Sequence, residues 1–141
     1  MIENQSSHVK ELLVKTAVII LAHGSKSGDA GDSVRRTAAA VKKQGGYEIV
    51  EYAFLQHTPP SPQDALESCI KQQAERVVVV PFFMQSGAHV ARDIPSLVEN
   101  ARKKYPGVEF VVTDCAGSHT LMAKIVMDLV GKGDRGLRSA E

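Results

Sequence analysis

The sequence has little of several residue types, and each shortage excludes a class of protein. It contains no tryptophan, and aromatic residues make up only 5% of its 141 residues. It has no aromatic residue suited to stacking on a flavin in the expected ligand loops. No apolar run approaches the roughly 20 residues that cross a bilayer. Seventeen basic and sixteen acidic residues leave a net charge of +1, so we expect neither nucleic acid nor a membrane as partner.

Cysteine is also scarce. Cys69 and Cys115 lie far apart and form no CxxC motif, so we expect reduced thiols and a cytoplasmic location. The amino-terminal segment MIENQSSHVKELLVK is polar and mixed in charge, and we expect no secretory signal there. A short helix is expected over residues 7–14, and both termini are expected to be flexible.

The length and composition are typical of one globular domain. A chain of this length buries a substantial core without disulfides, and 43% of its residues are hydrophobic. No linker or repeat divides it. We therefore expect a single domain over residues 1–141, with a core from about 16 to 130.

Apolar, β-branched segments alternate with segments of helical periodicity. Strands are predicted at Thr16–Ala22, Tyr47–Leu55, Arg76–Pro81 and Val108–Asp114. Helices are predicted over residues 30–44, 62–73, 91–104 and 118–130. This alternation predicts an α/β fold: a three-layer domain with a four-stranded parallel sheet and flavodoxin-like winding. The third strand is predicted to be central and the second to lie at an edge.

Several helix boundaries have local signals. Ser61 followed by Pro62 is typical of an N-cap and first helical position. Pro95 is tolerated only in a first turn, so we expect the regular part of its helix to begin near Ile94, with Asp93 as the cap. Ser118 is expected to cap the last helix.

Polar side chains follow each predicted strand. In a parallel sheet the carboxyl ends meet at one edge, where ligands bind. The residues gathered there are His23, Gln56, His57, His89, Asp114 and His119. Any single histidine after a strand is usually a hydrogen-bonded loop residue. His23 and His89 differ because their strands are expected to be neighbours.

Two neutral imidazoles on converging loops suit Co, Ni, Fe or Zn. Two ligands leave an open coordination sphere, as a delivery or catalytic site requires. Other chemistries have weaker support. The segment HGSKSGD is neither a GxGxxG nor a GxxxxGK[ST] motif, and Ser25 lies in no GxSxG elbow.

Two segments together carry a resemblance. LAHGSK (21–26) and VVVPFFMQSGAHVARDIP (78–95) resemble the class II chelatases of the short CbiX and SirB type, which insert metal into sirohydrochlorin. The resemblance implies a parallel α/β fold and a homodimer. It implies that His23 and His89 bind the metal and are catalytic. A third ligand in some members is a glutamate, and that position is Gln56 here, a weaker and neutral ligand.

The implied reaction is ATP-independent insertion of a divalent metal substrate, Co²⁺ first, with Ni²⁺ or Fe²⁺ as alternatives. The tetrapyrrole is expected to contact residues in the loops after the first and third strands. These residues are Ser25, Lys26, Phe83, Met84, Ser86, Gly87 and Arg92. For Phe83 a core position is an equal alternative. A non-catalytic metal- or tetrapyrrole-binding protein is the second hypothesis, and a structural α/β module is the third.

Overall fold

The computed structural model describes residues 14–25, 31–85 and 87–136. Within the last range, only the backbone of residue 89 is described. The predicted amino-terminal helix, the two termini, Lys26 and Ser86 lie outside the described residues. Within these ranges the elements follow the alternating order that the sequence predicts.

Four parallel strands form one sheet in the order β2-β1-β3-β4. The strands are β1 (Thr16–Ala22), β2 (Ile49–Phe54), β3 (Arg76–Pro81) and β4 (Glu109–Val112). The helices are α2 (Asp32–Gly45), α3 (Pro62–Lys71), α4 (Ala88–Lys104) and α5 (Met122–Asp134), with a 3₁₀ turn, η1, at Ala116–Ser118. The parallel α/β fold, the central β3 and the edge position of β2 are confirmed.

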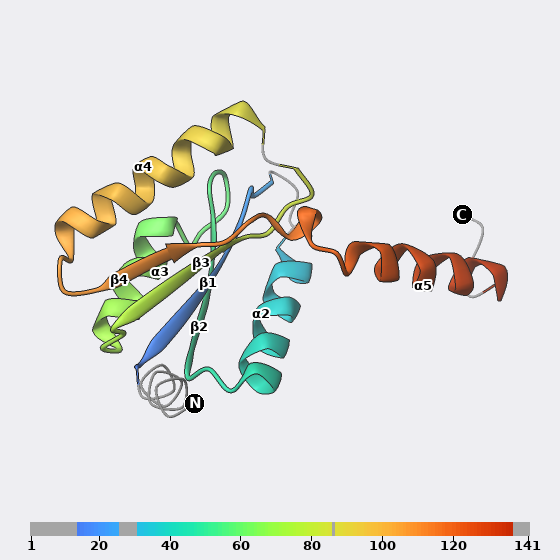
Figure 1. Ribbon diagram of the computed structural model, residues 1–141, viewed down its shortest axis with the longest axis horizontal. Coiled ribbons are helices and arrows are strands. Elements are labelled where there is room, and N and C mark those ends of the chain that lie inside the picture. The colour runs from blue at the N-terminus through green and yellow to red at the C-terminus, as the bar shows by residue number, and fades with distance from the viewer. Residues whose placement is uncertain (1–13, 26–30, 86, 137–141) are drawn as a thin grey trace, which may run out of the picture.

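Alternation along β1 divides the core into two layers. Ala17, Ile19 and Leu21 belong to the cluster that includes residues of α3 and α4. Val18 and Ile20 pack on the other side with residues of α2. Right-handed crossovers explain this division, because the chain moves from β1 to β2 in the opposite direction to its later crossovers. Figure 1 shows the helices on the two faces of the sheet.

The last helix does not join either layer. None of the residues of α5, all of which the structure describes, is buried. In Figure 1 this red helix runs away from the sheet. The face of the sheet that carries α2 therefore has a helix over β1 and β2, whereas α5 leaves its β3 side uncovered.

Two predicted helix boundaries are wrong. Helix α4 begins at Ala88, contains Pro95 inside it and has Gly87 as its N-cap, so Asp93 is not a cap. The apolar spacing of Val90, Ile94 and Val98, all buried in the α3–α4 cluster, favours one continuous helix and outweighs the hydrogen bond that proline removes.

Ser118 does not cap the last helix either. It ends the η1 turn, and its hydroxyl donates to the carbonyl oxygen of Cys115 at 2.7 Å. The imidazole Nδ1 of His119 instead accepts the N–H of Leu121 at 3.0 Å, so His119 precedes α5 and is not a residue of it. By contrast, the predicted cap at Ser61 is confirmed, and it forms a capping box with Asp64.

Candidate active site at the carboxyl edge of the sheet

His23 directly follows β1, the inner strand between β2 and β3. Backbone pairing continues beyond the strand ends on both sides. The N–H of Gln56 donates to the carbonyl oxygen of His23 at 3.0 Å, and the N–H of Phe82 donates to that of Leu21 at 2.7 Å. The backbone of His23 is therefore held by the same hydrogen-bond ladder as the sheet.

Gly24 lets the chain turn away immediately after this histidine. Its φ is +87°, in the left-handed region that favours glycine. A Cβ at this position would overlap the carbonyl oxygen of Gln56. Both the backbone angle and the close approach of the β2 loop therefore require glycine here.

The imidazole of His23 lies against the ring of Phe83. The ring centroids are 4.6 Å apart and the planes are tilted by 35°. Phe83 follows β3, and it also packs against the α3–α4 core cluster. A partly buried aromatic residue from the neighbouring strand end thus restricts where the histidine ring lies.

The loops after β3 and β4 approach each other closely. The N–H of Gly117 donates to the carbonyl oxygen of Phe83 at 3.0 Å. A Cβ on Gly117 would overlap the backbone of Met84, and the Cys115 thiol lies 3.9 Å from the Met84 carbonyl oxygen. The side chain of Met84 is itself 64% exposed, which leaves it free to contact a ligand.

The loop after β2 contacts the residues after β1 mainly through backbone groups. Gln56 and His57 are both exposed, and His57 has a φ of +68°. The hydroxyl of Thr58 donates to the carbonyl oxygen of Ser25 at 3.0 Å, which ties this loop to the loop after β1. The side chain of Gln56 is accessible beside the His23 backbone.

His89 lies in the first turn of α4, directly after β3 and its loop. Its neighbour Gly87 is exposed, and no atom lies within 4 Å of the place where a Cβ would stand. Arg92 follows one turn later and is exposed. The topology thus brings the backbone positions of His23 and His89 to the carboxyl ends of adjacent strands.

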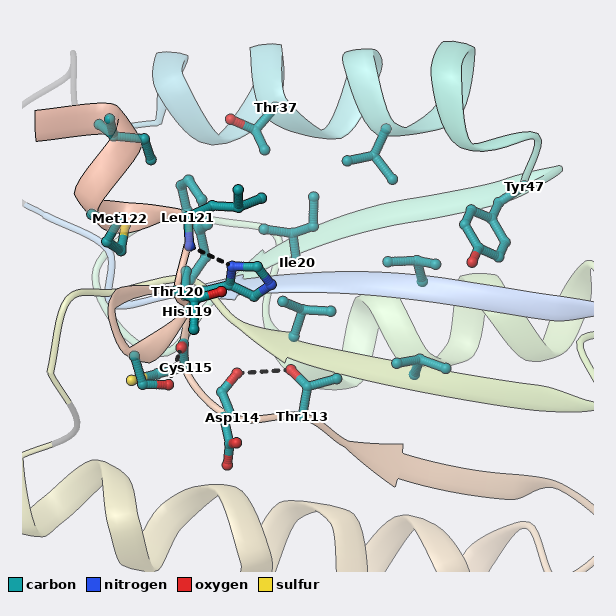
Figure 2. Close-up of a pocket in the computed structure, with 18 residues that line it drawn as sticks. Ile20, Thr37, Tyr47, Thr113, Asp114, Cys115, His119, Thr120, Leu121 and Met122 are labelled. Atoms are coloured by element: carbon teal, nitrogen blue, oxygen red, sulfur yellow. Dashed lines mark hydrogen bonds between the residues drawn. The ribbon is translucent and has the colours of Figure 1, made fainter. Parts of the chain in front are cut away.

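Asp114 and His119 also follow their strand, but they line a different feature. They lie at one end of an apolar groove of about 860 Å³ on the α2 face of the sheet. Figure 2 shows His119 hydrogen-bonded to the backbone of Leu121 and Thr113 hydrogen-bonded to Asp114. His23 is not among the residues that line this groove.

In the part of the chain described here, no three His, Cys, Asp or Glu side chains gather in a group that could hold a metal ion. Sequence reasoning missed Gly24 and Gly117, which control the approach of the loops. A glycine two residues after a strand is a signal for Gly24. Gly117 has no local signal, because its need for glycine comes from a contact with residue 84.

These features define a doubly wound α/β domain with a histidine at the carboxyl end of an inner strand, where this fold class binds ligands. The CbiX family profile matches residues 17–132. The chain belongs to the CbiX family, and the resemblance seen in its sequence is confirmed.

Two curated relatives are named as sirohydrochlorin chelatases. The chain is 37% identical over 113 residues to the chloroplastic sirohydrochlorin ferrochelatase of Arabidopsis thaliana, a match covering 80% of this chain and 50% of that protein. It is 30% identical to the sirohydrochlorin cobaltochelatase of Saccharolobus solfataricus, over 82% of this chain and 93% of that protein. The chain spans about half the length of the Arabidopsis protein.

Solved structures agree with the fold. The sirohydrochlorin chelatase SirB from Bacillus subtilis subspecies spizizenii, in complex with cobalt, superposes with a TM-score of 0.76 at 25% identity. The match covers 84% of this chain and 51% of that one. The parallel sheet described above is thus the chelatase fold.

No helix in the described ranges is long and apolar enough to cross a membrane.

Proposed function

We propose that the protein inserts a divalent metal ion into sirohydrochlorin without ATP. The observation that carries this proposal is His23, held by the sheet ladder and by the ring of Phe83 at the strand end next to the α4 turn with His89. Membership of the CbiX family supports it. The metal is a substrate: Co²⁺ is our first choice, and Ni²⁺ and Fe²⁺ are the alternatives.

In this reaction a metal ion replaces two pyrrole N–H protons of the macrocycle. His23 and His89 hold the ion as neutral imidazoles, and the positions that they leave open accept the pyrrole nitrogens. The two protons pass to an imidazole or to water beside it as the metal transfers. The fixed ring of His23 keeps the donor atom in place during this exchange.

The macrocycle carries carboxylates at its rim, and these suit basic side chains. We assign Lys26 and Arg92 to that contact. Ser25, Ser86 and Gly87 are small residue types that suit contact with a flat ligand, and we assign the exposed Met84 to its face. Phe83 is placed against His23 and the core, so its effect on the substrate acts through the histidine.

A second candidate is a protein that binds metal or tetrapyrrole without insertion. Gln56 favours it, because an exposed amide stands where related chelatases use a carboxylate. The proposal also includes a homodimer and a cytoplasmic location, the latter supported by two free cysteines.

Anaerobic insertion assays with Co²⁺, Ni²⁺ and Fe²⁺, followed by absorbance, separate the two candidates. We expect His23→Ala and His89→Ala to bind macrocycle but to insert metal about 100-fold more slowly, because the loss of a ligand should cost no less than the loss of a residue that orients one. Wild-type rates in both variants would show that the site assignment is wrong. Gln56→Glu tests the third position: an unchanged rate and metal preference would place residue 56 outside the site.

A further inference from the structure

Arg35 is a basic side chain whose position in the fold is not explained by stability. It closes the first turn of α2, where the positive end of the helix dipole disfavours a cation. Its ion pair with Asp32, of 3.2 Å, joins two exposed side chains three residues apart, and pairs of this kind contribute little to stability. A role in binding an anion explains the position better.

The guanidinium of Arg35 is restricted by its neighbours. It lies over the ring of Tyr52, 5.8 Å from the ring centroid, as cations do on aromatic faces. It also folds back over the start of the helix, because a Cβ added to Gly31 would lie 2.7–3.0 Å from three guanidinium atoms. The side chain therefore points toward the amino-terminal end of α2, and much of its freedom is lost before any ligand binds.

Part of the guanidinium remains available to a ligand. An arginine side chain carries five N–H donors in a planar fork. Among the described residues, the guanidinium makes one hydrogen bond, from Nη1 to Oδ1 of Asp32, and the side chain is 42% exposed. Nε and Nη2 are therefore left for a second carboxylate, which this fork binds through two parallel hydrogen bonds.

The topology places Arg35 beside the proposed metal site. Helix α2 begins at the carboxyl edge of the sheet, because the chain reaches it from the end of β1 (Figure 1). Tyr52 is paired with Ile20 of β1, three residues before His23, or about 10 Å along the strand. The guanidinium thus lies on the β2 side of His23, whereas His89 follows β3 on the other side.

The ring of Tyr52 is also connected to the residues that follow β1. It meets the ring of Phe54 edge-on, with the centroids 6.0 Å apart and the planes at 67°. Phe54 is buried, and its Cβ lies 3.2 Å from the place where a Cβ on Gly24 would stand. A series of packed residues therefore joins the support of Arg35 to the residue after His23.

We infer that Arg35 binds a carboxylate at the rim of the macrocycle, and that Tyr52 and Asp32 hold its guanidinium for this contact. The inference rests on the proposed function and names what the β2 side of the site recognises. A macrocycle centred on the metal ion extends its rim beyond the strands that carry the histidines. Arg35 of α2 and Arg92 of α4 then bind its carboxylates from opposite faces of the sheet.

Binding of the metal-free macrocycle, followed by its absorbance, tests this contact without metal insertion. Arg35→Gln keeps a polar side chain but removes the charge, and we expect about 5-fold weaker binding, as for loss of one partly exposed ion pair. Arg36→Gln is the matched control, because it removes the same charge from the next, exposed residue of α2 and should keep wild-type affinity. Equal affinities of the two variants would overturn the inference.

A chemically modified substrate tests which group Arg35 contacts. In a fully esterified macrocycle the rim carboxylates have no charge, so wild type and Arg35→Gln are expected to bind it equally. A 5-fold difference that persists with the ester would overturn the carboxylate contact. With the free acid, Arg35→Gln is expected to raise the KM for macrocycle and to leave kcat and the KM for metal unchanged.

The two proposals fail in different ways. Macrocycle binding that depends on Arg35, without metal insertion by the wild type, would refute the proposed function and support the carboxylate contact. Metal insertion by the wild type, with Arg35→Gln and Arg36→Gln binding macrocycle equally, would refute the carboxylate contact alone. Urea unfolding of both variants is expected to match the wild type, which shows that a change in affinity does not come from loss of the fold.

Discussion

The ring of Phe83 supports the ring of His23 at 4.6 Å, across the boundary between two adjacent strand ends. Phe83 also packs against the α3–α4 core cluster, so the histidine side chain is connected to the interior through one aromatic neighbour. This relationship links the stability of the core to the position of the proposed metal ligand.

Replacing Phe83 is therefore expected to lower the rate of metal insertion, although Phe83 is not itself a proposed metal ligand. Phe83→Ala removes the support of the imidazole, and we expect a loss of about 10-fold or more in the insertion rate. It also costs roughly 1–3 kcal/mol of stability, below the value for a fully buried phenylalanine. The adjacent exposed Met84→Ala is the control for loss of a ligand contact, and urea unfolding measures stability. Equal insertion rates in Phe83→Ala and wild type would show that the function of His23 does not depend on its contact with Phe83.

Gly24→Ala should destabilise the protein through two effects, the left-handed φ and the overlap with the Gln56 carbonyl. Gly46→Ala provides the matched control, because Gly46 has a φ of +73° but no atom within 4 Å of an added Cβ. Conformational strain alone costs about 1–2 kcal/mol. We expect Gly24→Ala to exceed Gly46→Ala in urea unfolding, and equal losses would contradict the close approach of the β2 loop.

Gly117→Ala is expected to displace the loop that carries Met84. An added Cβ would overlap the Met84 backbone, so the pairing of Gly117 with Phe83 must open. Gly107→Ala, where an added Cβ meets no atom within 4 Å, should have little effect. Insertion kinetics for the two variants provide the comparison. A Gly117→Ala rate equal to that of Gly107→Ala would show that the β3 loop does not depend on η1.

The two thiols should differ in reactivity. Burial, with a further contribution from Glu51, raises the pKa of the Cys69 thiol to about 12, whereas Cys115 is only partly buried. Because the thiolate is the reactive form, we expect a disulfide reagent at pH 8 to modify Cys115 in the native protein and Cys69 only after unfolding. Rapid modification of both thiols in the native protein would contradict this assignment.

The raised pKa also predicts how stability depends on pH. The folded protein keeps the Cys69 proton, whereas the unfolded chain loses it above its ordinary pKa. This contribution is therefore complete below about pH 9 and is lost between about pH 9 and 12, by at most about 1.4 kcal/mol per pH unit. Urea unfolding of wild type and Cys69→Ala at pH 8 and 10 isolates it: the stability gap between them should narrow at pH 10. An unchanged gap would refute the shift.

Much of the fold follows from local patterns. The all-apolar run of β1 predicts a strand buried on both faces, and the Ser61–Pro62 pair predicts the start of α3, because both signals lie within a few residues. The less apolar sequence around Glu48 and Glu51 correctly indicates that β2 lies at an edge. The alternation of strands and helices then implies a parallel sheet, in which the carboxyl ends of the strands lie together, and no tertiary contact has to be known to predict this.

The wrong predictions concern helix boundaries and loop contacts that depend on packing between residues far apart in the sequence. Pro95 breaks a local rule, yet the buried spacing of Val90, Ile94 and Val98 extends α4 through it. Ser118 is of a residue type that often caps helices, but its hydroxyl bonds within the η1 turn, and α5 begins four residues later without a side-chain cap. The need for glycine at 117 and the contact of Phe83 with His23 depend on which loops meet, and that information is not local.

Pro95 has a mechanical consequence for the proposed reaction. Without an N–H it cannot donate to the carbonyl oxygen of Ala91, so the opening turns of α4 are joined to the rest of the helix by one bond fewer. The backbone of His23 is held rigidly by the continued hydrogen-bond ladder of an inner strand, whereas the backbone of His89 belongs to the less rigid end of a helix. A metal ion bound by both histidines would therefore have one rigid ligand and one more mobile ligand, and the mobile ligand would be the first to dissociate from it.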